Sequence, residues 1–175
     1  MLYKNQEQIE YCLQRMGYQI LEETLPDKLA LIGIKERGLP LAKRLKRNLE
    51  KIVGCEILLG ELNISLYQND LSLLSTGPII HDVEIPFGIG GRELVLVDDV
   101  LITGQTAHAA IDAIQDLGHP ARIRFACLVD VKRRELPIYA DYVGWKLRLT
   151  RDEQLIFKIS EIDKEEGIWV EPIKR

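Results

Sequence analysis

Three stretches of the chain carry apolar residues at the spacing of an amphipathic helix. The first is residues 7–23, and its apolar face is made of Ile9, Leu13, Met16 and Ile20. The second begins near Pro40 and ends before Gly54, and its predicted inward face comprises Leu41, Leu45, Leu49 and Ile52. The third is residues 105–117. It is predicted to end at Gly118 and to bury Ala110, Ile114 and Leu117.

Short, continuous apolar runs lie between these helices and are typical of buried strands. The runs cover residues 29–34, 55–59, 93–97 and 122–129, and shorter strand candidates follow at 141–145 and 154–159. Strands that alternate with helices in this way predict an α/β fold, in which a parallel sheet is flanked by helices. Because ligands of such sheets bind beyond the carboxyl ends of the strands, the residues that follow each strand are the first candidates for chemistry.

Residues 63–91 interrupt this alternation. They contain several Gly and Pro residues and show no sustained period, so we expect a strand edge followed by a long protruding loop. A loop of this length inside a compact domain usually has a function. We expect residues 1–175 as a whole to form one domain, because this length is typical of a single domain.

The net charge of −4 and the pI of about 5.5 exclude an overall basic field that would recruit nucleic acid. Cys12, Cys55 and Cys127 are far apart and odd in number, and we expect buried, reduced thiols of a cytoplasmic protein. The first residues show no signal pattern, and no apolar run approaches the ~20 residues of a membrane span. No association with a membrane is therefore expected.

The strongest chemical signal follows the apolar run 93–97. Asp98 and Asp99 come directly after that run, and Thr103, Gly104 and Thr106 accompany the start of the third helix. Amides at a helix N-terminus bind phosphate, and a glycine lets the backbone approach it closely. Two adjacent carboxylates suit a vicinal diol or the water shell of a magnesium ion. A helix cap alone would require neither the two acids nor the glycine, so the pattern predicts a site for a ribose 5-phosphate.

This run, residues 97–106, resembles the 5-phosphoribosyl-1-pyrophosphate (PRPP) signature of the phosphoribosyltransferases. The resemblance implies that Asp98 and Asp99 are catalytic and contact magnesium through water. The implied phosphate-binding loop consists of Val100, Leu101, Ile102, Thr103, Gly104, Gln105 and Thr106. Val129 and Asp130, at the end of a later strand, would take part in binding the base.

The loop after the strand 29–34 consists of Lys35, Glu36, Arg37 and Gly38. By itself it would be explained by an ordinary strand–helix turn with a surface arginine. Beside the aspartate motif, it resembles the pyrophosphate loop of the same enzymes, which often holds a strained, sometimes cis, peptide. The resemblance implies that Arg37 is catalytic and meets the leaving diphosphate, and that Lys35, Glu36 and Gly38 contribute to substrate binding.

A wider resemblance, to the PyrR family, covers most of the chain. Segments 33–38, 41–45, 60–67, 98–106 and 128–130 fit it, and the run 134–144, which phosphoribosyltransferases in general do not share, is the most discriminating. Members regulate pyrimidine operons and are also uracil phosphoribosyltransferases. The resemblance implies that uracil and PRPP react to give UMP and pyrophosphate, with Mg²⁺, in a homodimer or homotetramer. It also implies a flexible hood at approximately residues 63–91.

The chain departs from this family in the phosphate-binding loop, where Ile102 and Gln105 stand in place of a tyrosine and an arginine, and in two further places. In the predicted hood, Gln68 and Asn69 replace charged residues. On the predicted RNA-binding face, positions that are cationic or histidine in RNA-binding members are occupied by Glu10, Tyr11, Tyr18, Tyr139 and Trp145. Basic residues that remain on that face are Arg15, Arg133, Arg134 and Lys146.

Because phosphate contacts dominate RNA affinity, these replacements predict weak RNA binding. We therefore rank a uracil phosphoribosyltransferase first. Two alternatives stay open at this point: an RNA-binding regulator of pyrimidine genes that responds to UMP or PRPP, and a purine-base phosphoribosyltransferase with the same PRPP site.

Overall fold

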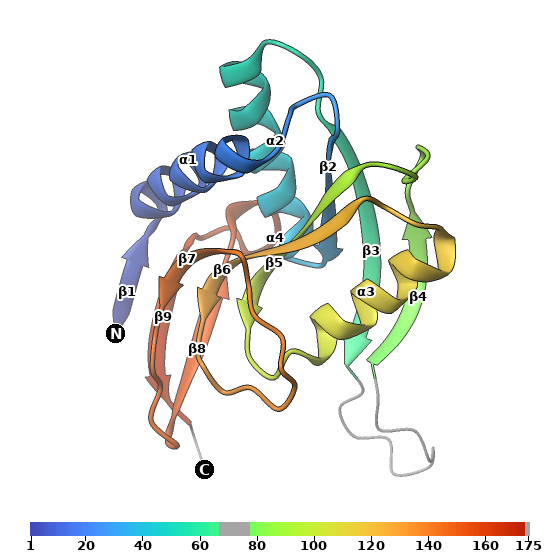
Figure 1. Ribbon diagram of the computed structural model, residues 1–175. Coiled ribbons are helices and arrows are strands. Elements are labelled where there is room, and N and C mark those ends of the chain that lie inside the picture. Colours follow the sequence, from blue (N-terminus) through green and yellow to red (C-terminus); the bar gives the residue numbers. More distant parts are fainter. Residues whose placement is uncertain (67–77, 174–175) are drawn as a thin grey trace.

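The apolar runs of the sequence form the centre of a six-stranded sheet with the order β4-β3-β2-β5-β6-β7. The computed structural model describes residues 1–66 and 78–173. The strands of this sheet are β2 (Leu29–Lys35), β3 (Leu58–Leu66), β4 (Pro78–Glu84), β5 (Glu93–Leu101), β6 (Arg122–Asp130) and β7 (Tyr142–Lys146). Neighbouring strands are parallel except for β3 and β4, which are antiparallel. The predicted α/β fold is confirmed, with an antiparallel strand added at one edge (Figure 1).

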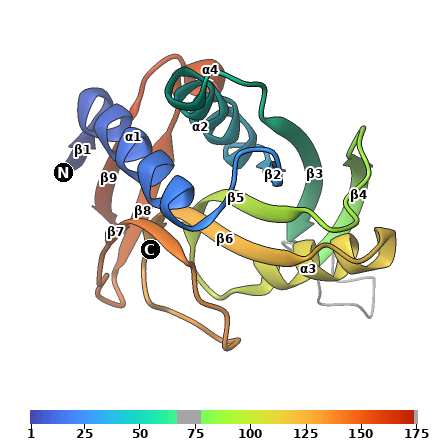
Figure 2. The same ribbon diagram turned by 45° about the horizontal axis from the view of Figure 1, so that its top comes forward.

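Helices cover both faces of this sheet (Figure 2). α1 (Gln6–Glu23) and α2 (Gly38–Val53) pack on one face, and α3 (Gln105–Leu117) packs on the other. α1 begins with a capping box, in which Asn5 and Gln8 each accept a hydrogen bond from the other's backbone N–H. α2 ends at Gly54, whose φ of 70° is a conformation that favours glycine.

A smaller, three-stranded sheet, with the order β1-β9-β8, stands beside the main sheet. It consists of β1 (Leu2–Asn5), β8 (Glu153–Lys158) and β9 (Gly167–Pro172), and α4 (Ser160–Asp163) connects β8 to β9. Only β8 was predicted from the sequence; β1 and α4, with four residues each, are too short to show a period. Arg44 of α2, whose side chain is only 6% exposed, forms ion pairs with Glu10 of α1, Glu161 of α4 and Glu166, and so connects α4 to α1 and α2.

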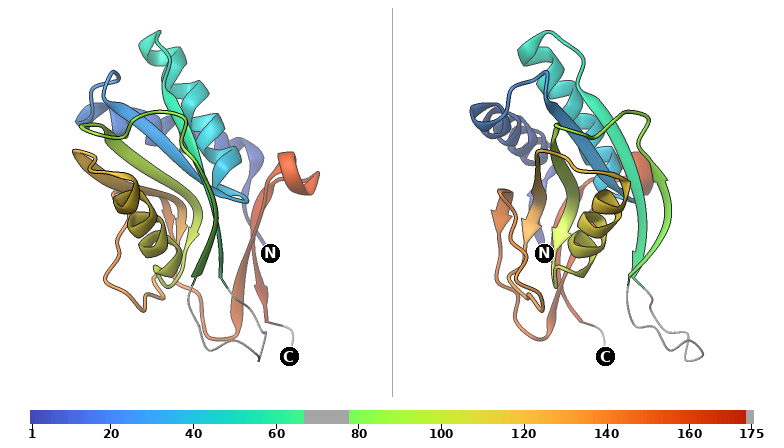
Figure 3. Two further views of the ribbon diagram at one scale, coloured as in Figure 1. Left: turned by 90° about the vertical axis from the view of Figure 1, so that its right-hand side faces the viewer. Right: turned by 45° about the vertical axis from the view of Figure 1, so that its right-hand side comes forward.

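The structure corrects the expectation that residues 63–91 are irregular. β3 continues to Leu66, and β4 lies antiparallel beside it (Figure 3). The register shifts between Asn63 and Ile64, and such a shift breaks the alternation by which a strand is recognised in a sequence. Residues 67–77 of the predicted hood, with Gln68 and Asn69, lie outside the described residues.

Three burial predictions are wrong. Ile52 and Leu117 are 40% and 51% exposed, because each lies in the last turn of its helix, beyond the residues that pack on the sheet. Cys55 is exposed as well, whereas Cys12 and Cys127 are buried free thiols as expected. Among the helices that the structure describes, none combines the length and the apolar character that a membrane span requires.

Candidate active site

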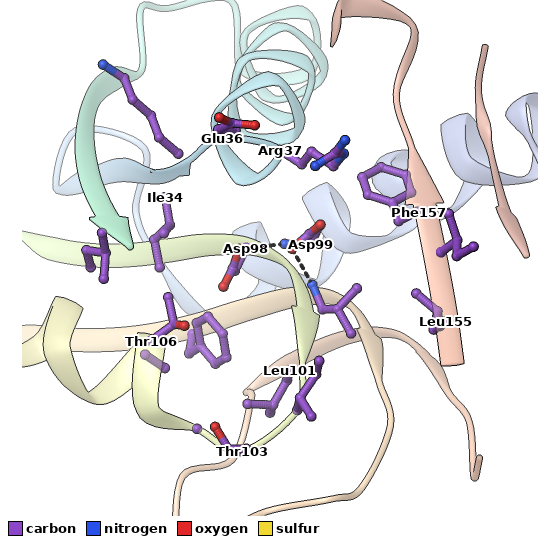
Figure 4. A pocket seen from close by; sticks show the side chains of 18 residues that line it. Ile34, Glu36, Arg37, Asp98, Asp99, Leu101, Thr103, Thr106, Leu155 and Phe157 are labelled. Carbon is purple, nitrogen blue, oxygen red and sulfur yellow. Dashed lines mark hydrogen bonds between the residues drawn. The ribbon is translucent and has the colours of Figure 1, made fainter. Parts of the chain in front are cut away.

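A cavity of about 550 Å³ opens near the carboxyl ends of β2 and β5. Its wall includes residues 34–37, residues 98–104 and residues 155–157 of β8. Figure 4 shows Arg37 on one side of Asp98 and Asp99, Thr103 and Thr106 on the other side, and Phe157 on the β8 side. The two loops that the sequence singled out therefore face each other across one cavity.

The two aspartates lie within β5 rather than after its end. β5 continues through them to Leu101, and its last residues still pair with Val129 and Asp130 of β6. Each carboxylate is oriented by the backbone: Asp99 N–H donates to Asp98 Oδ1 at 2.9 Å, and Val100 N–H donates to Asp99 Oδ1 at 2.8 Å. In Figure 4 Asp99 points towards Arg37 and Asp98 points away from it, as expected for successive residues of a strand.

The surroundings of this pair disfavour negative charge. Burial raises the pKa of the Asp98 carboxyl well above its ordinary value, and the charge of Asp99 raises it further. Burial also raises the pKa of Asp99, although the N–H of Val100 and the charge of Arg37 offset part of this effect. A bound cation or hydroxyl donors would therefore stabilise the charged forms of both carboxyl groups.

The loop between β5 and α3, residues 102–104, lines the cavity. Gly104 is the N-cap residue of α3 and has a φ of 92°. Because it has no side chain, it makes no capping hydrogen bond to the helix. The hydroxyl of Thr103 accepts a 3.3 Å hydrogen bond from Gln105 N–H, so it orders the loop. Amides of the first helical turn have no partner within the helix, and this arrangement can bind an anion such as phosphate.

The conformation of the loop itself also favours glycine at position 104. A Cβ on this residue would lie 3.0 Å from Ile138 Cβ, and its positive φ is a conformation that other residues rarely adopt. The segment that contains Ile138 is hydrogen-bonded to this loop, because the N–H groups of Glu135 and Leu136 both donate to Thr103 O. The discriminating run 134–144 of the sequence thus contains residues that support the loop of Thr103 and Gly104.

The last residue of β2, Lys35, and the loop that follows it supply two cations, and each is paired with a carboxylate. The Lys35–Glu36 peptide is cis, in agreement with the resemblance noted above. Lys35 Nζ lies 2.5 Å from Glu61 of β3. Arg37 forms a bidentate pair with Asp163 of α4, through Nε at 3.1 Å and Nη2 at 2.7 Å. Neither carboxylate was identified in the sequence, because each comes from a distant element.

Four predicted site residues are absent from the cavity wall: Gly38, Gln105, Val129 and Asp130. Val129 is fully buried in β6, and Asp130, 4% exposed, is bound bidentately by Arg134. The side chain of Gln105 instead donates to Glu135.

The wall also contains residues that sequence reasoning missed. Leu155, Ile156 and Phe157 of β8 supply an apolar side, joined by Phe125 and Ile64. The strand containing the first three was predicted, but a strand prediction does not say which sheet it joins or what it faces.

Comparison with known proteins agrees with this geometry. Residues 3–156 match the family model described as the phosphoribosyl transferase domain. The fold is similar to that of hypoxanthine phosphoribosyltransferase from Trypanosoma cruzi, with a TM-score of 0.76 and 19% identity over 97% of this chain and 93% of the other. The Staphylococcus aureus enzyme gives a TM-score of 0.75 and 18% identity, over 95% and 89% of the two chains. At these identities the likeness shows the fold alone.

Relatives found by sequence share a much larger fraction of identical residues with this chain. The chain is 44% identical to "Bifunctional protein PyrR" of Elusimicrobium minutum over 168 residues, 95% of this chain and 94% of the relative. It is 43% identical to the protein of the same name from Caldicellulosiruptor bescii over 169 residues, 96% and 93% of the two chains. Relatives of this identity along almost the whole chain, together with the matching domain model, show that the protein belongs to the PyrR family of phosphoribosyltransferases.

Proposed function

We propose that this chain transfers the phosphoribosyl group of PRPP to uracil, which gives UMP and pyrophosphate. The observation that carries the proposal is the placement of two carboxylates, those of the buried Asp98 and the partly buried Asp99, between the N-terminus of α3 and the segment that carries Lys35 and Arg37. PRPP has the matching order of groups: a 5-phosphate, a pair of ribose hydroxyls and a diphosphate. The choice of uracil rests on membership of the PyrR family.

Each group of the substrate has a proposed partner. Amides of Thr103, Gly104 and Thr106 bind the 5-phosphate, and the Asp98 and Asp99 carboxylates accept hydrogen bonds from the ribose hydroxyls. Arg37 and Lys35 contact the diphosphate and stabilise its charge as it leaves. The chain thereby acts mainly by positioning the reactants, as expected where bond breaking at the ribose carbon leads the reaction.

The carboxylate pair also fits a magnesium ion. Mg²⁺ prefers oxygen ligands, keeps several waters and is commonly bound by one or two carboxylates together with substrate phosphates. Asp98 and Asp99 would hold it through water, and their raised pKa values mean that a nearby cation would favour their charged forms. The ion would supply charge neutralisation of the diphosphate.

For the base, we propose the apolar side of the cavity formed by Leu155, Ile156 and Phe157. A flat heterocycle buries its faces against such side chains, and the polar edge is then free for backbone contacts. The proposed roles of Val129 and Asp130 are indirect, since Asp130 orders Arg134 and thereby the support of the phosphate loop.

The experiment that tests this function measures PRPP consumption with a panel of free bases that includes uracil, hypoxanthine and guanine, with and without Mg²⁺. We expect turnover with uracil, a requirement for Mg²⁺ and little activity with the purines. Turnover with a purine and none with uracil would establish the purine-base alternative. PRPP binding without turnover of any base would favour the alternative of a regulator that responds to PRPP.

A second function has support in the printed name of the relatives, "Bifunctional protein PyrR". Regulation through RNA is the second activity that the family resemblance implies. We rank it below the enzyme because the predicted RNA-binding face has lost cationic residues. A cytoplasmic location and a homodimer or homotetramer complete the proposal, and gel filtration with light scattering tests the assembly.

A further inference from the structure

We propose that Asp163 is a positioning residue of this active site, which holds the guanidinium of Arg37 in the orientation that receives the diphosphate of PRPP. The proposal rests on the function proposed above, and it gives the smaller sheet a part in catalysis. Asp163 is the last residue of α4 and is 126 positions away from Arg37 in the sequence. It does not line the cavity itself, whereas Arg37 does.

The first argument is geometric. Asp163 binds one edge of the guanidinium, accepting from Nε at 3.1 Å and from Nη2 at 2.7 Å. A guanidinium has five N–H donors in a rigid plane. The Nη1 group has no hydrogen-bond partner among the described residues, and one N–H of Nη2 also remains. The pairing therefore fixes the plane of Arg37 and leaves its far edge available to phosphate oxygens.

The second argument concerns Asp163 itself, which is held in place. Ile159 N–H donates to Asp163 Oδ2 at 2.9 Å, and Ile159 is fully buried in the core. The neighbouring Glu161 is bound by the buried Arg44, which anchors α4 to the helices of the main sheet. A carboxylate with this support can orient a flexible arginine, whereas a freely rotating surface acid cannot.

The third argument is electrostatic. The side chains of Arg37 and Asp163 are 31% and 17% exposed, so the pair is partly shielded from solvent. Hydrogen bonding to Arg37 holds the pKa of Asp163 below its ordinary value, and the same bond raises the pKa of Arg37. Asp163 is therefore charged at neutral pH and keeps Arg37 in its pairing geometry before substrate arrives.

The test is calorimetry of PRPP binding in the presence of Mg²⁺ for the wild type, Asp163→Asn and Arg37→Ala. Asparagine keeps the shape of the side chain and loses the bidentate acceptor. We expect PRPP to bind roughly tenfold more weakly to Asp163→Asn, the loss of about one charge-assisted contact, with the affinity for UMP unchanged. Glu165→Gln is the matched control, since it removes a nearby carboxylate that pairs with Lys158 instead.

A double-mutant cycle separates positioning from a structural role. If Asp163 acts through Arg37, Asp163→Asn has no further effect on PRPP affinity once Arg37 is alanine. Equal losses for UMP and PRPP, or additive losses in the double variant, would overturn the proposal. Tighter PRPP binding to Asp163→Asn would also overturn it, because the carboxylate would then compete with the diphosphate for Arg37.

These outcomes are distinct from failure of the proposed function. Wild-type protein that does not bind PRPP would refute both proposals. Wild-type protein that binds PRPP and turns over uracil, with Asp163→Asn unaltered in both, would refute the role of Asp163 alone.

Discussion

The backbone of Gly38 passes so close to Val97 that a Cβ on Gly38 would lie 2.5 Å from the carbonyl oxygen of Val97. The same Cβ would lie 3.0 Å from Asp98 Cα. The start of α2, directly after the proposed pyrophosphate loop, is thus in contact with the strand that carries the two aspartates. Gly38 is absent from the cavity wall, but it allows the loop of Lys35 and Arg37 to lie close to the strand of Asp98 and Asp99.

We predict that Gly38→Ala displaces the loop of Lys35 and Arg37 from β5. The added methyl group has no space, and overpacking of this kind costs about 1–3 kcal/mol of stability. Turnover should fall further, by about a hundredfold, because catalysis depends on the position of the reactants. Steady-state kinetics and urea denaturation measure the two effects. Gly90→Ala, where a Cβ meets nothing within 4 Å, is the control and should leave both unchanged.

Asp98→Asn should stabilise the fold while it removes activity. Burial of the Asp98 carboxylate is unfavourable, as its raised pKa shows, and an amide of the same shape avoids that cost. We expect the free energy of unfolding at neutral pH to rise by about 1 kcal/mol, which is about 2–4 °C in Tm for a chain of this size. A variant with both lower stability and normal turnover would contradict the proposed role.

The pH dependence of this gain follows from the direction of the shift. A carboxyl whose pKa is raised on folding favours the folded state below its ordinary pKa, and this contribution is lost as the pH rises through the raised value. The difference in unfolding free energy between Asp98→Asn and the wild type should therefore be largest at neutral pH and shrink as the pH falls towards about 4. Urea denaturation across this range measures it, and a difference that grows on acidification would refute the explanation.

We predict that Asp130 acts through Arg134 rather than through the base. Burial acts to raise the pKa of Asp130, but the hydrogen bonds from Arg134 outweigh it and hold the pKa below its ordinary value. Asp130→Ala would leave the partly buried guanidinium of Arg134 without its carboxylate partner, at a cost of about 1–3 kcal/mol. Thermal unfolding should show this loss, and the double variant Asp130→Ala/Arg134→Met should recover part of it. An altered preference among bases with normal stability would instead place Asp130 in the base site.

RNA binding is predicted to be weak. Tyr11, Tyr18 and Tyr139 are more than half exposed on the predicted RNA-binding face, and they carry no charge there. Arg15 is engaged with the carbonyl of Gly144 at 2.7 Å, and Arg134 is engaged with Asp130. A filter-binding titration with the organism's pyrimidine-operon leader RNA, with and without UMP, is the measurement. Nanomolar, UMP-dependent binding at physiological salt would make regulation the main function.

Much of the main sheet could be predicted because its signals are local. A continuous apolar run identifies β2, β5 or β6, and the helical period and Gly118 placed α3 at the residues that the structure shows. The aspartate pair and the loop to Thr106 were recognisable for the same reason. One strand, one turn and one helix start follow each other within 14 residues, 93–106, so their chemistry can be inferred without knowledge of the rest.

Only the tertiary structure decided which distant groups complete the site. The acids that pair with Lys35 and Arg37 are Glu61 and Asp163, and the apolar side of the cavity comes from β8. These contacts depend on how the smaller sheet packs beside the main sheet. In the smaller sheet, β1 at the start of the chain pairs with β9 near its end. Such pairing joins residues more than 160 positions apart, and its energy comes from burial and hydrogen bonds that exist only after folding. Local propensity and spacing therefore determined the proposed catalytic motif of this protein, whereas packing between its two sheets determined which distant carboxylates pair with Lys35 and Arg37.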